Sequence, residues 1–225
     1  MLIVQGDEVP ISESNTVREG TLNRRFVLAG EPGSPGNFRL SIAYQLGDFY
    51  SPRHRHNFDQ FRFLIDGESD FDRNGTMKPG WLGYFPEGAY YGPQQSNNPN
   101  VTAVLQFGGP SGSCYLSTGQ VTQAARAMKS FGRFEKGVFH RNDGVSGKAT
   151  MDSFQATWEH VNGRPMIYPQ PQYADPILMN SNDYRWMPLD GVAGVEEKAL
   201  GTFTDCAIRC ARYKIEPGAT FAARG

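Results

Sequence analysis

Two histidines stand two residues apart, at His54 and His56, and they are half of the four histidines in the chain. The segment around them reads as a β-strand, in which residues i and i+2 point to the same face. Both imidazoles can therefore converge on one point inside a barrel or sandwich. Neutral imidazole is the commonest protein ligand for transition metals, so the spacing suggests a metal site. The simpler alternative is a polar pair on a solvated strand face.

Two further residues near this pair can contribute donor atoms. Gln60 offers an amide oxygen, which is a weaker, neutral donor than a carboxylate; the alternative for Gln60 is an interior hydrogen-bonding residue with no metal. Tyr91 offers a phenol that ligates a metal well only when it is ionised, and its reference pKa is ~10. The alternative for Tyr91 is an aromatic wall of a ligand pocket. His140 and His160 have no spaced partner, and we expect neither to ligate a metal.

Arginine and tyrosine side chains in the same region suggest a site for a small molecule. Arg53 and Arg55 alternate with the histidines and should point away from them, so Arg62 is the better candidate to clamp a carboxylate. Tyr84 and Tyr90 belong to a local surplus of aromatic residues. Most of that surplus should be core, and a few members could line a cavity for a planar or apolar ligand.

The elements that must position these residues are mostly short strands. Gly and Pro, at 26 and 15 residues, occur in short clusters that predict turns. Apolar and polar residues alternate over 38–46, and further strands are expected at 25–29, 60–65, 70–73, 81–85 and 101–107. Asn74-Gly75 is the strongest hairpin signal. A capping box at Ser117 and Gln120 predicts a helix that ends near Gly132. A second short helix is expected over 151–161. The Pro-rich stretch 163–176 is expected to form an extended connector.

The spacing of glycines and one proline around the candidate residues resembles the two signature motifs of the cupin superfamily. The first motif reads Gly47, six residues, His54-x-His56, three residues, Gln60, six residues and Gly67; the second reads Gly80, five residues, Pro86-Glu87-Gly88, two residues and Tyr91. The Asn74-Gly75 hairpin lies between the motifs, as that fold requires. The resemblance is specific over residues 38–107.

This resemblance implies an all-β fold, a small antiparallel jelly-roll β-barrel of the RmlC-like type that is open at one end. In cupins with intact motifs, two His, a Glu and the second-motif His ligate one divalent metal. His54, His56, Gln60 and Tyr91 stand at these positions, so the chain departs from the pattern at two of four ligands. The resemblance implies a weaker site that could still hold Fe, Mn, Ni, Cu or Zn, or no metal at all.

The C-terminal tail predicts an additional β-structure. Residues 212–225 echo the approach to the first motif, with Gly218 in the place of Gly47 and Gly225 in the place of His54. We therefore expect an N-terminal arm (1–22), a cupin barrel (23–116), a helical and Pro-rich connector (117–180) and the start of a second, incomplete cupin-like domain (181–225). Such a chain would be a fragment of a two-barrel bicupin. Two alternatives are tail strands that complete a neighbouring subunit's sheet, in a homodimer, and a coincidental echo.

Composition and charge limit the classes of binding partner and the cellular location that we expect. A net charge of -1 gives no electrostatic reason to expect nucleic acid or an anionic membrane as a partner. No apolar run approaches the ~20 residues that span a bilayer, and the N-terminus does not read as a secretory signal. Cys114, Cys206 and Cys210 are an odd number without a CxxC pair, which predicts thiols in a reducing cytoplasm.

Three functions are compatible with these residues. The retained HxH favours a metal-dependent, dioxygenase-like enzyme acting on a small aromatic or carboxylated ligand. The substitutions at Gln60 and Tyr91 favour a non-catalytic, small-molecule-binding or regulatory cupin that has lost full metal ligation. A metal-free cupin using acid and base side chains is the third reading. The sequence assigns no substrate.

Overall fold

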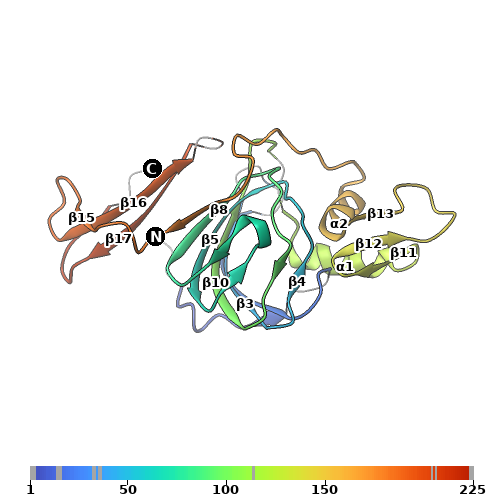
Figure 1. The fold of residues 1–225 in the computed structure, drawn as a ribbon, viewed down its shortest axis with the longest axis horizontal. Helices are drawn as coiled ribbons and strands as arrows, with labels where there is room; N and C mark the ends of the chain where they lie inside the picture. The colour runs from blue at the N-terminus through green and yellow to red at the C-terminus, as the bar shows by residue number, and fades with distance from the viewer. Residues whose placement is uncertain are drawn as a thin grey trace.

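The computed structural model describes residues 4–13, 17–31, 34, 37–112, 115–203, 205 and 207–222. It has a central antiparallel barrel, a helical unit on one side and a three-stranded tail sheet on the other (Figure 1). The predicted all-β jelly-roll architecture is therefore confirmed.

The larger sheet of the barrel has seven antiparallel strands in the order β1-β2-β3-β10-β5-β8-β14. The order includes the crossovers that a jelly roll requires, because β10 lies between β3 and β5. The strands are β1 (Ser12–Glu13), β2 (Leu22–Ala29), β3 (Phe38–Gln45), β5 (Asp59–Asp66), β8 (Trp81–Phe85), β10 (Asn100–Phe107) and β14 (Ile177–Asn180).

A smaller sheet of four short strands forms the other wall of the barrel, in the order β4-β9-β6-β7. Its strands are β4 (Tyr50–Ser51), β6 (Ser69–Asp70), β7 (Thr76–Met77) and β9 (Gln94–Gln95). The predicted Asn74-Gly75 hairpin joins β6 to β7 through a short 3-10 helix, η1 (Asp72–Asn74).

Alternation along the central strands separates the inside of the barrel from its outside. On β5, Gln60 and Arg62 line the interior, whereas Phe61 and Phe63 pack in a cluster on the outer face. The same period of two sends Arg24 on β2 and Arg39 on β3 inward. Polar side chains are thus placed inside the barrel by ordinary strand geometry.

The stretch after the barrel forms a compact helical unit. Helix α1 (Thr118–Met128) begins at the predicted capping box of Ser117 and Gln120, and α2 (Ser153–Asn162) ends at Gly163 in the left-handed conformation. The predicted end near Gly132 is wrong, because α1 ends at Met128 with Lys129 as its C-cap. Gly132 instead opens a three-stranded sheet that sequence patterns did not indicate, made of β11 (Gly132–Glu135), β12 (Val138–Arg141) and β13 (Thr150–Asp152).

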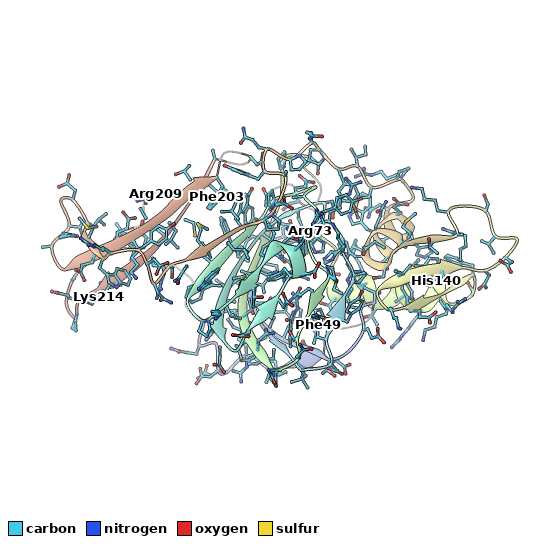
Figure 2. All side chains as sticks on the ribbon, in the orientation of Figure 1. Phe49, Arg73, His140, Phe203, Arg209 and Lys214 are labelled. Carbon is cyan, nitrogen blue, oxygen red and sulfur yellow. The ribbon has the colours of Figure 1, made fainter. Side chains whose placement is uncertain are left out.

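The tail forms a third sheet, with β15 (Met187–Pro188), β16 (Val195–Phe203) and β17 (Ile208–Ile215). Its strands are antiparallel, as expected for this region. Leu200 and Phe203 of β16 pack on Phe61 and Tyr84 of the outer barrel face, and Figure 2 labels Phe203 at the end of the hairpin nearest the barrel. Just before this sheet, β14 joins the barrel beside β8, so the stretch expected as connector also supplies an edge strand.

Two further expectations concern cysteines and membranes. Cys210 is a free, half-buried thiol, and Cys114 and Cys206 lie outside the described residues. In the part of the chain that the structure describes, no helix is long and apolar enough to cross a membrane.

Candidate functional site

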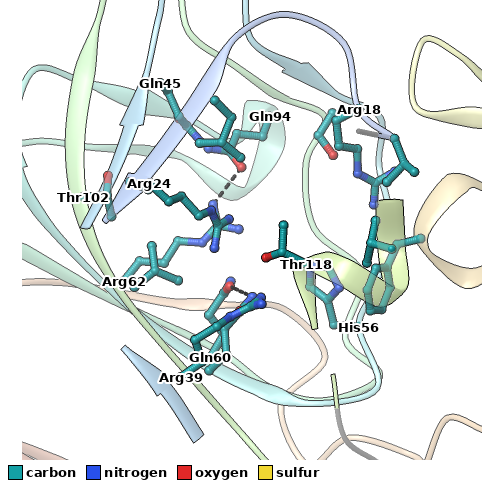
Figure 3. A pocket seen from close by; sticks show the side chains of 18 of the residues that line it. Arg18, Arg24, Arg39, Gln45, His56, Gln60, Arg62, Gln94, Thr102 and Thr118 are labelled. Carbon is teal, nitrogen blue, oxygen red and sulfur yellow. Dashed lines mark hydrogen bonds between the residues drawn. The ribbon is translucent and has the colours of Figure 1, made fainter. Parts of the chain in front are cut away.

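A cavity of about 140 Å³ lies inside the barrel. Strands β2, β3, β5 and β10 supply about half of the residues in its wall, and α1 and α2 contribute Thr118, Val121 and Phe154, so the helical unit covers one side of it. Figure 3 shows polar side chains from these and other segments of the chain converging on it. The polar members are Arg18, Arg24, Arg39, Gln45, Ser51, His54, His56, Gln60, Arg62, Gln94, Thr102, Gln106 and Thr118.

His54 and His56 both line this cavity, and their Nε2 atoms lie 3.2 Å apart. Their segment is not the regular strand that we expected: only His54 forms an isolated bridge, with Tyr91. The spacing still brings the rings together. His54 Nδ1 lies 2.6 Å from the carbonyl oxygen of Pro52. Because a carbonyl only accepts, Nδ1 carries the proton, and the Nε2 lone pair of the neutral ring faces His56.

Both imidazoles are held neutral. Burial lowers the pKa of His54 well below its ordinary value, and Arg18 and Arg62 lower it further. Burial also lowers the pKa of His56, with the His54 ring and Arg18 adding to the effect. His56 Nδ1 has no hydrogen-bond partner within the described ranges. The pair therefore offers lone pairs rather than positive charge at neutral pH.

Tyr91 and Gln60 lie close to the histidines but are engaged by Arg62. The Tyr91 ring centroid lies 4.5 Å from that of His54, and its hydroxyl accepts a hydrogen bond from Arg62 Nη2 at 3.0 Å. Burial raises the Tyr91 pKa despite this cation, so the side chain is a neutral phenol. With its amide oxygen turned toward Arg62, Gln60 accepts from Nε at 2.8 Å and Nη2 at 3.0 Å.

The four-ligand metal site implied by the resemblance fits this geometry only in part. The two imidazoles face each other suitably, and the Pro52 carbonyl fixes the His54 ring as backbone carbonyls do for metal-ligating histidines. The phenol and the amide do not fit, because both are bound to a guanidinium that repels a divalent cation. Within the described residues, no cluster of three or more His, Cys, Asp or Glu side chains could hold a metal.

Arginines dominate the electrostatics of the cavity, and sequence reasoning found only Arg62. Burial lowers the pKa of Arg24 to about 9, with Arg39 and Arg62 nearby adding to the effect. Burial lowers the pKa of Arg39 to about 10. All of these groups remain cationic at neutral pH. A sequence signal for Arg24 and Arg39 is that residues two or four positions apart on a strand share a face. Arg24 shares its face of β2 with Leu22 and Phe26, and Arg39 shares its face of β3 with Ala43, all of which line the cavity.

Hydrogen-bond donors also outnumber acceptors inside the cavity. Gln60 has one amide oxygen, and it faces donors on two sides. In one orientation of the amide, that oxygen accepts from Gln106 Nε2 at 3.0 Å, and in the other it accepts from Arg62. The Gln106 oxygen is already taken by Arg39 Nε and Nη2, at 3.1 and 2.5 Å. One donor facing Gln60 therefore lacks an acceptor in either orientation.

Two residues expected to bind a ligand lie elsewhere. Tyr84 is fully buried in the outer-face cluster and donates to Asp59, so it does not line the cavity. Tyr90 is 45% exposed and stacks outside the cavity under Arg53 and Arg55. These contacts agree with the expectation that both arginines point away from the histidines. Neither Tyr84 nor Tyr90 lines the cavity, because strand and loop geometry turns both rings away from it.

The helical unit is fastened to the barrel beside the histidines. Arg18 of the N-terminal arm forms a 2.6 Å ion pair with Asp152, the residue that caps α2. Phe154, in the first turn of α2, packs edge-on against His56 with ring centroids 5.4 Å apart. His140 is on β12, outside the barrel (Figure 2).

Comparisons with known proteins address the fold. No family model matches the chain, and no curated protein matches it. Among solved structures, a candidate dioxygenase from Nostoc punctiforme superposes with a TM-score of 0.53 at 13% identity, over 88% of this chain and 55% of that protein. An RmlC-like cupin protein from Ralstonia eutropha gives 0.40 at 12% identity, over 74% of this chain and 92% of its own. Oxalate decarboxylase from Lactobacillus farciminis gives 0.48 at 12% identity, over 97% and 66%.

These likenesses concern architecture alone, since every identity lies far below the range in which function transfers. The chain spans about half the length of the Nostoc punctiforme protein, 55%. The two-sheet barrel, the spacing of the motifs and the structural match agree with one another. The chain has the cupin fold.

Proposed function

We propose that the barrel binds a small organic anion, a carboxylate with a compact apolar body, beside the histidine pair. One observation carries the proposal. Four arginines, Arg18, Arg24, Arg39 and Arg62, line the cavity, and none of the described residues that line it is Asp or Glu. Arg18 has its carboxylate outside the cavity, in Asp152. The structure gives no ion pair for the other three arginines in the part of the chain it describes.

Burying several cations together without counter-charge is unfavourable. Each loses hydration, and each is repelled by its neighbours in a medium that screens poorly. A bound carboxylate removes part of both costs, and it supplies acceptor oxygens where the cavity has surplus donors. Sites with this arrangement of charge favour anions over neutral molecules of the same shape.

The cavity also limits the size and shape of the ligand. Its volume, about 140 Å³, is close to the ~150 Å³ of an engineered apolar cavity that binds benzene. Part of the wall is apolar, from Leu22, Phe26, Val104, Leu116 and Phe154. Benzoate combines one carboxylate with a planar apolar ring and is therefore a suitable probe.

A second candidate function is metal-dependent, dioxygenase-like catalysis on such a ligand. The specific observation that favours it is the facing pair of His54 and His56 Nε2 atoms at 3.2 Å. Because Gln60 and Tyr91 are held by Arg62, a metal here would rest on two imidazoles, and we expect weak binding. Without such a metal, the same cavity serves a binding or regulatory role.

Titration calorimetry with benzoate and its neutral isostere benzamide tests the proposal. The protein is purified without a polyhistidine tag and kept in a buffer free of carboxylates and phosphate. We expect benzoate to bind at one site per chain, and benzamide to bind at least about tenfold more weakly, because charge-assisted hydrogen bonds are the stronger ones. Equal binding of the two compounds, or no binding of benzoate, would contradict the proposal.

A further inference from the structure

We infer that Arg24, rather than Arg62, is the residue that receives the carboxylate and so determines the specificity of the cavity. This inference rests on the proposed function and adds to it the identity of the anion-binding side chain. It follows from comparing how completely the protein itself satisfies the three buried guanidinium groups.

Arg62 is already enclosed by protein partners. It donates to Gln94 Oε1 at 2.7 Å and to the Tyr91 hydroxyl at 3.0 Å, and the Gln60 oxygen can accept from its remaining side. Its guanidinium also lies over the rings of Phe85 and Phe71, at 4.7 and 5.2 Å from the centroids. Ring faces attract cations, so these contacts replace part of the lost hydration. A ligand would have to displace these partners.

Arg39 is satisfied in a similar way. Its Nε and Nη2 both donate to Gln106 Oε1, at 3.1 and 2.5 Å, and its guanidinium carbon lies 4.5 Å from the centroid of the Tyr115 ring. The ring of Phe26 lies on it as well, at 5.4 Å. Arg39 therefore fixes the wall of the cavity and contributes positive potential to it.

Arg24 lacks comparable partners. The one hydrogen bond that the structure gives its side chain is a long contact of 3.5 Å from Nη1 to Ser41 Oγ, and its buried Nε has no partner among the described residues. Figure 3 shows its guanidinium projecting into the cavity near Arg62. The low pKa of this group, caused by burial and then by Arg39 and Arg62, is what a cation without a counter-ion should show.

The placement of Arg24 sets the orientation of the ligand. Its neighbours on the same face of β2, Leu22 and Phe26, line the cavity as well and give the body of the ligand an apolar surface. In Figure 3, His56 lies on the other side of Thr118 from Arg24, on the same side as Arg18, and its ring is in contact with that of His54. A carboxylate on Arg24 therefore directs the rest of the ligand toward helices α1 and α2 and the imidazoles.

The test compares Arg24→Gln with Arg25→Gln in calorimetric titrations with benzoate. Arg25 is the matched control because it is adjacent on β2, does not line the cavity and donates to the backbone of Gly6. We expect Arg24→Gln to lose about tenfold to a hundredfold in benzoate affinity, as expected for hydrogen bonds to a charged group. Arg25→Gln should bind like the parent, and Arg24→Lys should fall between them, since a lysine keeps the charge without the planar fork.

The ligand-free melting temperature provides a second readout that does not depend on the probe. If Arg24 is a poorly satisfied cation kept for binding, Arg24→Gln should melt higher than the parent while binding benzoate more weakly. A residue with a purely structural role would lower the melting temperature. That result, or benzoate affinity within threefold of the parent for Arg24→Gln, overturns the inference.

These outcomes distinguish a failure of the role of Arg24 from a failure of the proposed anion site. Binding by the parent that survives Arg24→Gln refutes the role of Arg24 and leaves the anion site intact. Absence of benzoate binding by the parent refutes the proposed function and the role of Arg24 together. Phosphate that competes as strongly as benzoate refutes the carboxylate assignment in favour of a general anion site.

Discussion

The ion pair between Arg18 and Asp152 should hold the helical unit against the barrel. Its atoms Nη1 and Oδ2 lie 2.6 Å apart, and the two side chains are 11% and 17% exposed. The same Nη1 also donates to the Gly137 carbonyl and to Ser153 Oγ, both at 2.9 Å. The perturbation that isolates the charge is Asp152→Asn, because Asn caps helix N-termini about as well as Asp.

The expected cost follows from burial and geometry. Removing one partner of a fully buried ion pair costs about 3–5 kcal/mol, and the partial exposure of this pair lowers the figure to about 2–3 kcal/mol. Asp152 Oδ1 also accepts from the backbone N–H groups of Phe154 and Gln155 as the cap of α2. Asp152→Ala loses this cap as well and should cost about 1 kcal/mol more than Asp152→Asn.

Urea unfolding followed by fluorescence measures these free energies, and a double-mutant cycle with Arg18→Met isolates the pair. We expect a coupling free energy of about 2 kcal/mol. A coupling below about 0.5 kcal/mol would show that the pair behaves like an exposed surface bridge, and it would refute the role of this contact in holding the helical unit against the barrel.

Three further predictions follow from individual residues. Gly67→Ala should destabilise the protein by about 2–4 kcal/mol in urea unfolding. The reason is that the residue has φ +76° and an added Cβ would lie 2.4 Å from the Pro99 oxygen. The control Gly6→Ala has open space around the added Cβ and should be near neutral. Benzoate affinity should be steady near neutral pH and fall as pH rises through about 9, where Arg24 loses its proton. Because burial lowers the pKa of Arg24, the ligand-free fold should gain stability over the same rise in pH. A benzoate affinity unchanged well above that pH would contradict the assignment of Arg24. Elemental analysis of untagged protein should find substoichiometric metal, and a chelator should leave the benzoate affinity unaltered. One metal per chain that disappears in His54→Ala would instead favour the dioxygenase-like candidate.

The fold was predictable from the sequence because its determinants are local. Gly67 and Gly80 adopt positive φ at turns, where only glycine fits without strain, so their spacing records the geometry of the barrel. The capping box at Ser117 and the left-handed Gly163 mark helix ends by equally local chemistry. The convergence of His54 and His56 also follows from a spacing of two residues, even though their segment is not a regular strand.

The character of the cavity could not be predicted in the same way. Whether Arg24 points inward depends on the register of β2 against β3, which shifts between Phe26 and Leu28. The contact that holds the helical unit joins Arg18 to Asp152, which are 134 positions apart in the chain. Tyr84 has the residue type expected of a ligand wall, but its strand position directs it to the outer face, where the tail covers it. Each of these facts depends on tertiary packing rather than on a motif.

The central claim is that the barrel cavity is an anion site, and a crystal structure of the protein grown with benzoate tests it most directly. We predict one benzoate inside the barrel, with its carboxylate ~2.7–2.9 Å from a guanidinium nitrogen, and that guanidinium should be Arg24. A cavity that holds no benzoate at saturating concentration would contradict it. A divalent metal bound jointly by His54, His56, Gln60 and Tyr91, with Arg62 displaced from the last two, would contradict it equally.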